Sequence, residues 1–228
     1  NQEPRVSLVV ATIGRVPELE ALLASLAAQE HPPGPAPSLE VVVIDQSGDE
    51  RLVPLLTRPI AGLSILHLRS EIRAVSHARN IALGHCRGAI VGFPDDDCTY
   101  SPGVLAAVET AFRANPCIDI VSGVVADPDG RPGPVRWPSG AGDISPANVW
   151  QAVMSAGLFV RLPALRRLGG FDERLGIGGV FGSAEETDLV LRALSRGSRA
   201  LFDPSVRIAH PNRDVSRTPA RRAFDYGR

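Results

Sequence analysis

The chain has 228 residues, of which 44 % are hydrophobic, and its formal net charge is -1. This length and composition suit one large α/β domain or two small ones, and the near-neutral charge removes any global electrostatic case for nucleic-acid binding. All 24 basic residues are arginine. A P-loop phosphate site and Schiff-base chemistry are therefore excluded, because both need lysine.

Cysteine content and hydropathy indicate the cellular setting. Three scattered cysteines are too few for a disulfide framework or a thiolate zinc site. The sequence shows no signal-peptide pattern, and no apolar run approaches the roughly 18 residues that span a bilayer. We expect a reduced, cytoplasmic setting, with a place at the inner face of the membrane left open. The arginine-rich residues 213–228 are a candidate for contact with anionic lipid, although a solvated tail is the simpler interpretation.

In the first half of the chain, short apolar segments alternate with amphipathic ones. A helix is predicted to begin near Pro17, and another over Ile72–Cys86. Alternation of this kind predicts an α/β fold with a doubly wound, mostly parallel sheet and helices on both faces. The predicted strands are Val6–Ala11, Leu39–Asp45, Leu63–Leu68 and Ala89–Phe93.

The pattern changes after Val125. Asp127–Ser145 is rich in proline and glycine and is predicted to form a long loop or a flap. The elements predicted beyond it are a strand over Val153–Val160, helices over Leu162–Leu168 and Ala184–Ser195, and a short strand over Val206–Ala209.

Polar residues follow the predicted strands directly. Ligands bind at the carboxyl ends of strands in sheets of this kind, so these residues are expected to converge on one edge. They are Thr12, Gly14, Arg15, Asp45, Gln46, Asp95, Asp96 and Asp97.

Three consecutive aspartates, Asp95–Asp97, end the fourth predicted strand. Two carboxylates about 4 Å apart repel by roughly 1 kcal/mol in water and about 4 at an effective dielectric constant of 20, so a cation is expected to offset them. Oxygen ligands favour Mg²⁺ or Mn²⁺. The competing interpretation is a solvated turn in which Asp97 or Ser101 caps a helix that begins near Pro102.

A second acidic group, Glu185–Asp188, opens a predicted helix. Acidic first turns are common because the helix dipole favours them. The preceding residues 176–183 contain four glycines, which would allow a substrate to approach closely, and a carboxylate is a suitable base toward a sugar hydroxyl. His210 follows the last predicted strand, and a lone histidine is more often structural than a ligand.

These segments, in this order, resemble the family 2 glycosyltransferases, inverting enzymes with the GT-A fold, over nearly the whole chain. The family's first two strands end in turns that match VVATIGR and VVVIDQSGD here. The later matches are HARN (His77–Asn80), GFPDDDC (Gly92–Cys98), GGFDE (Gly169–Glu173), EETDL (Glu185–Leu189) and RIAHPNRD (Arg207–Asp214).

The resemblance implies roles for individual residues. It makes Asp97 the principal metal ligand, with Asp95 and His210 beside it and Mg²⁺ or Mn²⁺ as the cofactor. Glu186 falls where the family places its catalytic aspartate, and Glu185 and Asp188 stay candidates. The residues implied to contact the nucleotide are Thr12, Arg15, Asp45, Gln46, Arg73, Asn80, Asp95 and Asp96. Gln46 stands where the family often has an aspartate that pairs with uracil, so the choice of nucleotide stays open.

The resemblance therefore implies an inverting transfer of sugar from a nucleotide-diphosphate donor to a hydroxyl on a sugar or lipid-linked acceptor, in polysaccharide or glycoconjugate synthesis. Residues 1–126 would bind the donor, and residues 127–228 would form a smaller acceptor-binding and catalytic half of one continuous GT-A domain, with truncation at its C-terminus left open. A catalytically silent nucleotide-sugar scaffold remains an alternative. A sugar nucleotidyltransferase is disfavoured because TIGRVPE has a single glycine, and a receiver domain would need a lysine. The oligomeric state is left open.

Overall fold

The computed structural model describes residues 5–29, 39–129 and 135–211. Within them, nine strands form one sheet in the order β3-β2-β1-β4-β8-β6-β9-β5, and β7 pairs with β9. The strands are β1 (Val6–Thr12), β2 (Leu39–Asp45), β3 (Leu63–Arg69), β4 (Ile90–Gly92), β5 (Thr99–Tyr100), β6 (Ile120–Ala126), β7 (Gly142–Ile144), β8 (Leu158–Arg161) and β9 (Ala200–Ala209).

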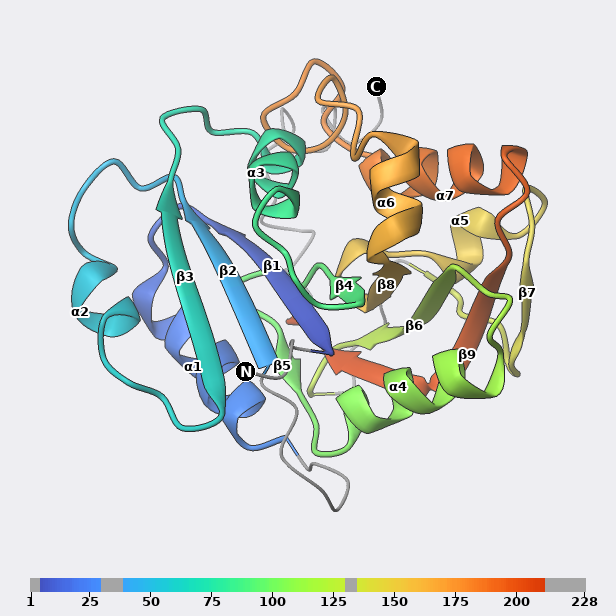
Figure 1. Ribbon diagram of the computed structural model, residues 1–228, viewed down its shortest axis with the longest axis horizontal. Helices are drawn as coiled ribbons and strands as arrows, with labels where there is room; N and C mark the ends of the chain where they lie inside the picture. The colour runs from blue at the N-terminus through green and yellow to red at the C-terminus, as the bar shows by residue number, and fades with distance from the viewer. Residues whose placement is uncertain (1–4, 30–38, 130–134, 212–228) are drawn as a thin grey trace.

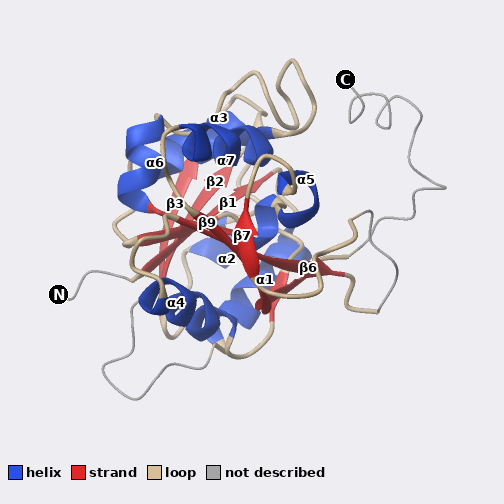
Figure 2. Cartoon of the chain, turned by 90° about the vertical axis from the view of Figure 1, so that its right-hand side faces the viewer, coloured by secondary structure: helices blue, strands red, loops and turns tan. Residues whose placement is uncertain are grey.

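Helices cover both faces of this sheet, with α3, α6 and α7 on one side and α1 and α4 on the other (Figures 1 and 2). None of the described helices is long and apolar enough to cross a bilayer. The helices are α1 (Val16–Ala27), α2 (Val53–Leu56), α3 (Val75–Leu83), α4 (Val104–Ala114), α5 (Val149–Ala152), α6 (Leu162–Leu168) and α7 (Glu185–Ser195), with a 3₁₀ turn over Ser155–Gly157.

The sheet is mostly parallel. β1 pairs in parallel with β2 and β4, β2 with β3, and β6 with β9. β8 lies antiparallel between β4 and β6, so β6 and β9 point the same way as the first four strands. The carboxyl ends of β1, β2 and β4 therefore meet at the edge where the sequence analysis expects a site, and the end of β9 reaches the same edge.

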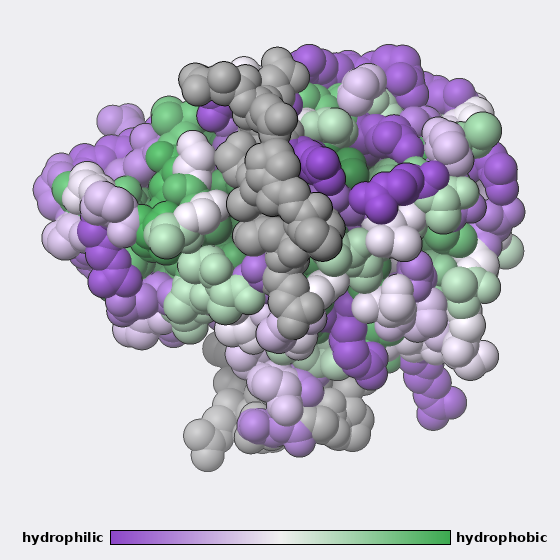
Figure 3. Space-filling model, turned by 60° about the horizontal axis from the view of Figure 1, so that its bottom comes forward, coloured by the Kyte–Doolittle hydropathy of each residue, from purple (hydrophilic) through white to green (hydrophobic). Residues whose placement is uncertain are grey.

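Alternating residues of the central strands pack into two separate cores. Leu8 and Val10 of β1 pack with the α1 and α4 side, whereas Val9 packs with the α3, α6 and α7 side. Continuous β-branched runs are typical of strands buried on both faces, and each fully buried aliphatic side chain contributes about 1.5–3 kcal/mol. On the surface below the sheet, hydrophobic and hydrophilic side chains are mixed (Figure 3), as is usual for proteins.

The four predicted N-terminal strands are confirmed within one or two residues, as are the helices over residues 162–168 and 184–195. The predicted helix over 72–86 is shorter, because residues 70–74 form a turn whose carbonyls accept hydrogen bonds from Gln46. The strand predicted over Val153–Val160 begins only at Leu158, after the 3₁₀ turn, and the last strand is longer than predicted and begins at Ala200.

Three strands were not predicted, β5, β6 and β7. β7 lies inside the predicted loop Asp127–Ser145 and pairs with β9. β6 contains Gly123, which interrupts an apolar run. Glycine is needed at this position because a Cβ would lie 2.2 Å from the carbonyl oxygen of Val206 on β9. Residues 130–134 of the predicted loop and the arginine-rich residues 213–228 lie outside the described residues.

Candidate active site

The ends of β1 and β2 lie side by side and begin the site. The backbone N–H of Gln46 donates to Thr12 O at 2.8 Å, and the Thr12 hydroxyl donates to Asp96 Oδ2 at 2.6 Å. Gly14, which turns the chain after β1, has a φ of +93°, and a Cβ there would meet Arg51 and Ser47 at 2.8 Å. The turn after β1 is thereby fixed against the turn formed by Asp95–Asp97, here called the aspartate turn.

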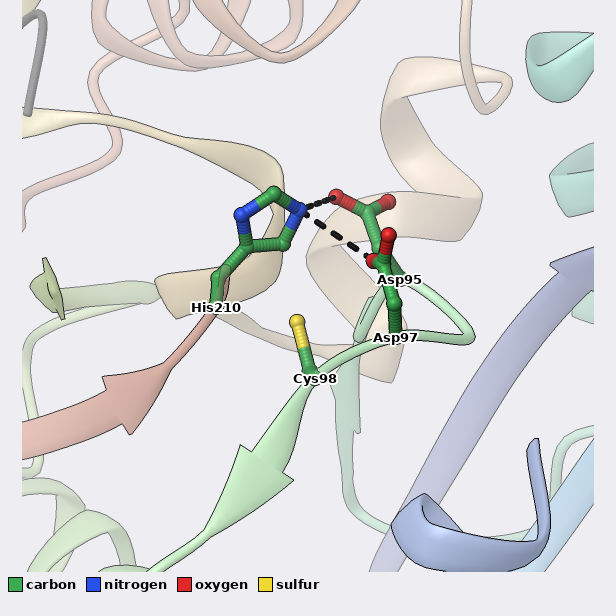
Figure 4. A group of neighbouring side chains, drawn as sticks. All are labelled: Asp95, Asp97, Cys98 and His210. Atoms are coloured by element: carbon green, nitrogen blue, oxygen red, sulfur yellow. Dashed lines mark ion pairs between the residues drawn. The ribbon is translucent and has the colours of Figure 1, made fainter. Parts of the chain in front are cut away.

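A two-residue strand joins the aspartate turn to the end of the sheet. β5 pairs with β9, Thr99 opposite Ala209, and this pairing places Asp97 next to His210. The His210 Nε2 atom lies 3.2 Å from Asp97 Oδ1 and 3.6 Å from Asp95 Oδ2 (Figure 4). The structure therefore brings together the three residues proposed as metal ligands.

Arg15 lies on the other side of the aspartate turn. Its Nη1 donates to Asp97 Oδ2 at 2.6 Å, and its other nitrogens pair with Asp96. Burial acts to raise the pKa of Asp97, but the hydrogen bonds and charges of His210 and Arg15 outweigh it and hold that pKa well below its usual range. Asp97 is therefore ionised at neutral pH. The alternative in which Asp97 or Ser101 caps α4 is wrong, because the helix begins after Gly103 without a side-chain cap.

Arg79 of α3 connects the aspartate turn to the start of α7. Its Nη1 donates to Glu185 Oε1 at 3.0 Å, and its Nη2 lies 3.6 Å from Asp95 Oδ1. Loss of hydration raises the pKa of Asp95, while the charges of Arg79 and His210 act in the opposite direction. The two acidic segments identified from the sequence thus form one site, with the buried guanidinium of Arg79 between them.

The three acidic residues at the start of α7 lie in different environments. Glu185 is 8 % exposed and bound to Arg79. Glu186 is half-buried, and loss of hydration together with the charge of Glu185 raises its pKa to about 8. Asp188 accepts from Arg192 Nε at 2.7 Å, one turn along the helix. Its carboxylate is thus held along α7 and not in the acidic cluster.

The turn that begins α7 has an unusual backbone. Ala184, the residue before Glu185, has a φ of +73° and is the one non-glycine residue with positive φ among the described residues. Such a conformation costs about 1–2 kcal/mol and tends to occur at functional sites. The Gly176–Ser183 segment before it packs on α3, where Val75 N donates to Ile177 O at 2.9 Å.

A second group of polar residues surrounds the ends of β2 and β3. Asp45 accepts from Ser47 N at 2.9 Å, and its other oxygen lies 3.1 Å from His67 Nε2. The Gln46 side-chain amide donates to Ile72 O and, at 3.4 Å, to Ala74 O. Arg73 donates to the carbonyls of Gln46 and Ser47 at 3.1 and 3.0 Å. The residues implied to hold the nucleotide base are thus adjacent.

Asn80 lies elsewhere. Its side chain donates to Phe171 O and to Glu173 Oε1, both at 3.0 Å, and accepts from Phe171 N at 2.8 Å. Gly170, with a φ of +78°, passes so close that a Cβ would lie 2.4 Å from Asn80 Oδ1. The structure thus places Asn80 on the Gly169–Glu173 segment rather than among the aspartates.

The donor set suits a hard divalent cation. Ligand atoms from Asp95, Asp97, Cys98 and His210 all lie within 4.8 Å of one another. Carboxylate oxygens and an imidazole nitrogen suit Mn²⁺ or Mg²⁺. Burial raises the pKa of the Cys98 thiol well above its usual value, so it stays protonated and is the poorest ligand of the four.

No role was predicted for Arg79 from the sequence, although Arg79 lies in the HARN motif. A signal was present. Arg79 lies three residues after Ser76 and three before Ala82, both on the buried face of α3, so a charged residue stands at an apolar position of the helical period. A buried arginine requires anionic partners, and the sequence offers two acidic clusters to supply them.

Known glycosyltransferases match most of this sequence. The sequence model described as Glycosyl transferase family 2 matches residues 7–155. A pre-mycofactocin glycosyltransferase of Mycobacterium tuberculosis (strain ATCC 25618 / H37Rv) is 28 % identical over 204 residues, which cover 83 % of this chain and 41 % of that protein. The chain thus spans about two fifths of the length of the curated relatives it matches.

Solved structures share the fold. S. aureus TarS 1-349 in complex with UDP-GlcNAc aligns with a TM-score of 0.74 at 21 % identity, over 92 % of this chain and 59 % of that chain. The mannosyltransferase PcManGT from Pyrobaculum calidifontis, in complex with GDP-Man and Mn²⁺, aligns with a TM-score of 0.69 at 26 % identity, over 94 % of this chain and 59 % of that one. The fold is of the GT-A type, and because the family model covers more than half of the sequence, the chain belongs to glycosyl transferase family 2.

Proposed function

We propose that this protein is an inverting, metal-dependent glycosyltransferase that moves a sugar from a nucleotide-diphosphate donor to a hydroxyl acceptor in polysaccharide or glycoconjugate synthesis. The observation that carries the proposal is the meeting of Asp95, Asp97 and His210 within reach of one cation, next to the acidic start of α7. In this proposal residues 1–126 bind the donor and residues 127–228 supply the acceptor side.

The donor nucleotide is assigned to the edge formed by β1, β2 and the turn before α3. Gln46, Arg73 and Asp45 would face the base and ribose, with Thr12 and Arg15 between them and the aspartates. The pairing of Arg15 with Asp96 and Asp97 supports this, because an arginine already at the aspartates can also pair with a diphosphate oxygen. Asn80 is better suited to holding the Gly169–Glu173 segment than to contacting the nucleotide.

Asp97, Asp95 and His210 would hold a divalent cation. When bound, Mn²⁺ or Mg²⁺ supplies positive charge that stabilises the diphosphate as it leaves. Asp97 is suited to this role because it is ionised and only 9 % of its side chain is exposed. The complex of PcManGT with GDP-Man and Mn²⁺ supports a similar arrangement here.

The acidic residues of α7 would perform the proton transfer. Glu186 would accept the proton of the acceptor hydroxyl while the hydroxyl oxygen attacks the anomeric carbon from the face opposite the diphosphate. A single displacement of this kind inverts the anomeric configuration, and a base in this position contributes about 10²–10⁴-fold in rate. Glu186 is suited to the role because its raised pKa, about 8, makes its ionised form, which becomes populated as the pH rises toward that value, a stronger base than an ordinary carboxylate.

The proposal can be tested with a panel of uridine, guanosine and thymidine diphosphate sugars. The purified chain is mixed with each donor, with and without Mn²⁺, and its melting temperature and the release of nucleoside diphosphate to alcohol acceptors are measured. We expect one donor to raise the melting temperature only with Mn²⁺ and to yield a product of inverted anomeric configuration by proton NMR. Binding without release would point to a silent scaffold, and a product of retained configuration would rule out the single displacement.

A further inference from the structure

Arg79 is a buried cation held between the two acidic segments of the site. The residue is 2 % exposed, and its partners are Glu185 at 3.0 Å and Asp95 at 3.6 Å. A guanidinium stays charged in proteins, and burying it is costly unless anions face it. The two carboxylates and Arg79 therefore form one electrostatic unit that spans the turn after β4 and the start of α7.

Two aromatic rings fix the guanidinium from its sides. Its central carbon lies 5.8 Å from the ring centroid of Phe93 and 5.3 Å from that of Phe171. These rings meet edge to face at 5.0 Å, and the negative face of an aromatic ring attracts a guanidinium. Four groups from three segments of the chain thus determine where Arg79 lies, which makes it a rigid support for the carboxylates.

Arg79 affects the two neighbouring glutamates of α7 differently. Glu185 is 8 % exposed and has one carboxylate oxygen bound to Arg79, so its rotation is restricted and that oxygen is already engaged. Glu186 is half-buried, and loss of hydration together with the charge of Glu185 raises its pKa. The left-handed backbone at Ala184 immediately precedes both residues.

We infer that Arg79 is a positioning residue that holds Glu185 and Asp95 in place and so leaves Glu186 to act as the base. The inference rests on the proposed function and extends it by naming the residue that positions the carboxylates around the base. The proton passes from the acceptor hydroxyl to a Glu186 oxygen as the hydroxyl oxygen bonds to the anomeric carbon. The bond from that carbon to the diphosphate oxygen breaks, and its electrons leave with the nucleoside diphosphate.

The test compares kcat and donor KM for Glu186→Gln, Glu185→Gln, Arg79→Met and Arg79→Lys. Arg161→Met is the matched control, because Arg161 also stacks on a phenylalanine, Phe112, at 4.9 Å but lies at the opposite end of β4. We expect Glu186→Gln and Arg79→Met to lower kcat by about 10²-fold or more, with donor KM changed less than about threefold. Glu185→Gln is expected to cost less than about tenfold, and Arg161→Met to keep the wild-type kcat.

Further readouts separate positioning from folding. Arg79→Lys keeps the charge and is expected to recover part of kcat, whereas Arg79→Met is expected to shift the pH of half-maximal activity upward, because a cation that favours ionised Glu186 is gone. The stoichiometry of Mn²⁺-dependent donor binding, by calorimetry, reports the folded fraction. Loss of kcat with an unchanged pH profile and no recovery by lysine would assign Arg79 a structural role only.

The remaining outcomes separate this inference from the proposed function. A Glu185→Gln variant as inactive as Glu186→Gln would move the base to Glu185 and overturn the inference. Unaltered turnover by Glu186→Gln would overturn it as well, while the proposed transfer itself stands. If the wild-type chain turns over none of the donors, the proposed function fails, and the inference fails with it.

Discussion

The Nε2 atom of His210 lies 3.2 Å from Asp97 Oδ1, although the two residues come from distant parts of the sequence. The contact depends on the pairing of β5 with β9, Thr99 opposite Ala209. His210 is also fixed through its backbone, since its N–H donates to Ala126 O at 2.9 Å. The end of the last strand is therefore built to hold an imidazole against the aspartate turn.

Replacing His210 with alanine is predicted to weaken Mn²⁺ binding by about 10- to 100-fold, because the loss of one ligand from a small set is rarely compensated. Titration of free Mn²⁺ by electron paramagnetic resonance measures the dissociation constant. His77→Ala is the matched control, because His77, on α3, pairs with Glu173, outside the aspartate cluster. Equal affinities of His210→Ala and the wild type would remove His210 from the cation site.

The stability of the metal-free protein is predicted to fall as the pH rises through neutrality, in part because of Glu186. The folded state raises the pKa of Glu186 from 4.5 to about 8, so between these values the folded state holds more protons than the unfolded state. The free energy of unfolding then decreases with rising pH. We expect a contribution of roughly 2 kcal/mol, less than the whole shift implies because water still reaches this half-buried group.

The comparison that isolates this effect is Glu186→Gln against the wild type. Urea unfolding at about pH 5.5 and about pH 8.5, with a chelator present, gives the free energy of unfolding in each case. The wild type is expected to lose more stability over this interval than the variant does. Equal losses in the two proteins would mean that Glu186 has an ordinary pKa.

The positive φ of Ala184 predicts an unusual response to glycine. A left-handed alanine costs about 1–2 kcal/mol, which Ala184→Gly would relieve, while the added freedom of the unfolded chain costs about 0.4–1 kcal/mol. The variant is therefore expected to be as stable as the wild type or slightly more so. Ala193→Gly, in the buried interior of the same helix, is expected to lose about 1 kcal/mol or more. Similar losses in chemical denaturation would contradict the left-handed turn.

Asn80→Ala is predicted to affect stability rather than donor binding. The variant removes three hydrogen bonds to the Gly169–Glu173 segment, so we expect a loss of about 2–3 kcal/mol, equivalent to roughly 4–12 °C in melting temperature. Donor KM below the transition is expected to stay within about threefold of wild type. Asn115→Ala, which removes one hydrogen bond to the carbonyl of Ala111, serves as the reference for the loss of stability caused by a single hydrogen bond. A large rise in donor KM at an unchanged melting temperature would instead mean that Asn80 contacts the nucleotide.

Local sequence patterns were sufficient for the parts of the fold that are encoded locally. β1 and β2 are continuous β-branched runs, and such runs identify strands buried on both faces. Their polar ends, Thr12 and Asp45, could be placed at one edge because parallel strands end together. The aspartate turn was identifiable for the same reason, since Asp95–Asp97 follow an apolar strand directly.

The contacts that complete the site were not accessible from the sequence because they are not local. β5 has only two residues, too few for any periodic signal, yet it places Asp97 next to His210. Arg79 acquires its partners only when α3, the aspartate turn and α7 are packed together. The separation of Glu185 from Glu186 likewise depends on burial and on Arg79, which a run of adjacent acidic letters does not reveal.

The most direct test of the account is whether nucleotide binding depends on a cation held by Asp97. Isothermal titration of the cognate nucleoside diphosphate is carried out with and without Mn²⁺ for the wild type, for Asp97→Asn and for Asp143→Asn, a surface control on β7. We expect Mn²⁺ to tighten binding at least about tenfold in the wild type and in Asp143→Asn, and to have no effect on Asp97→Asn. An Asp97→Asn variant that still responds fully to Mn²⁺ would contradict the proposed cation site.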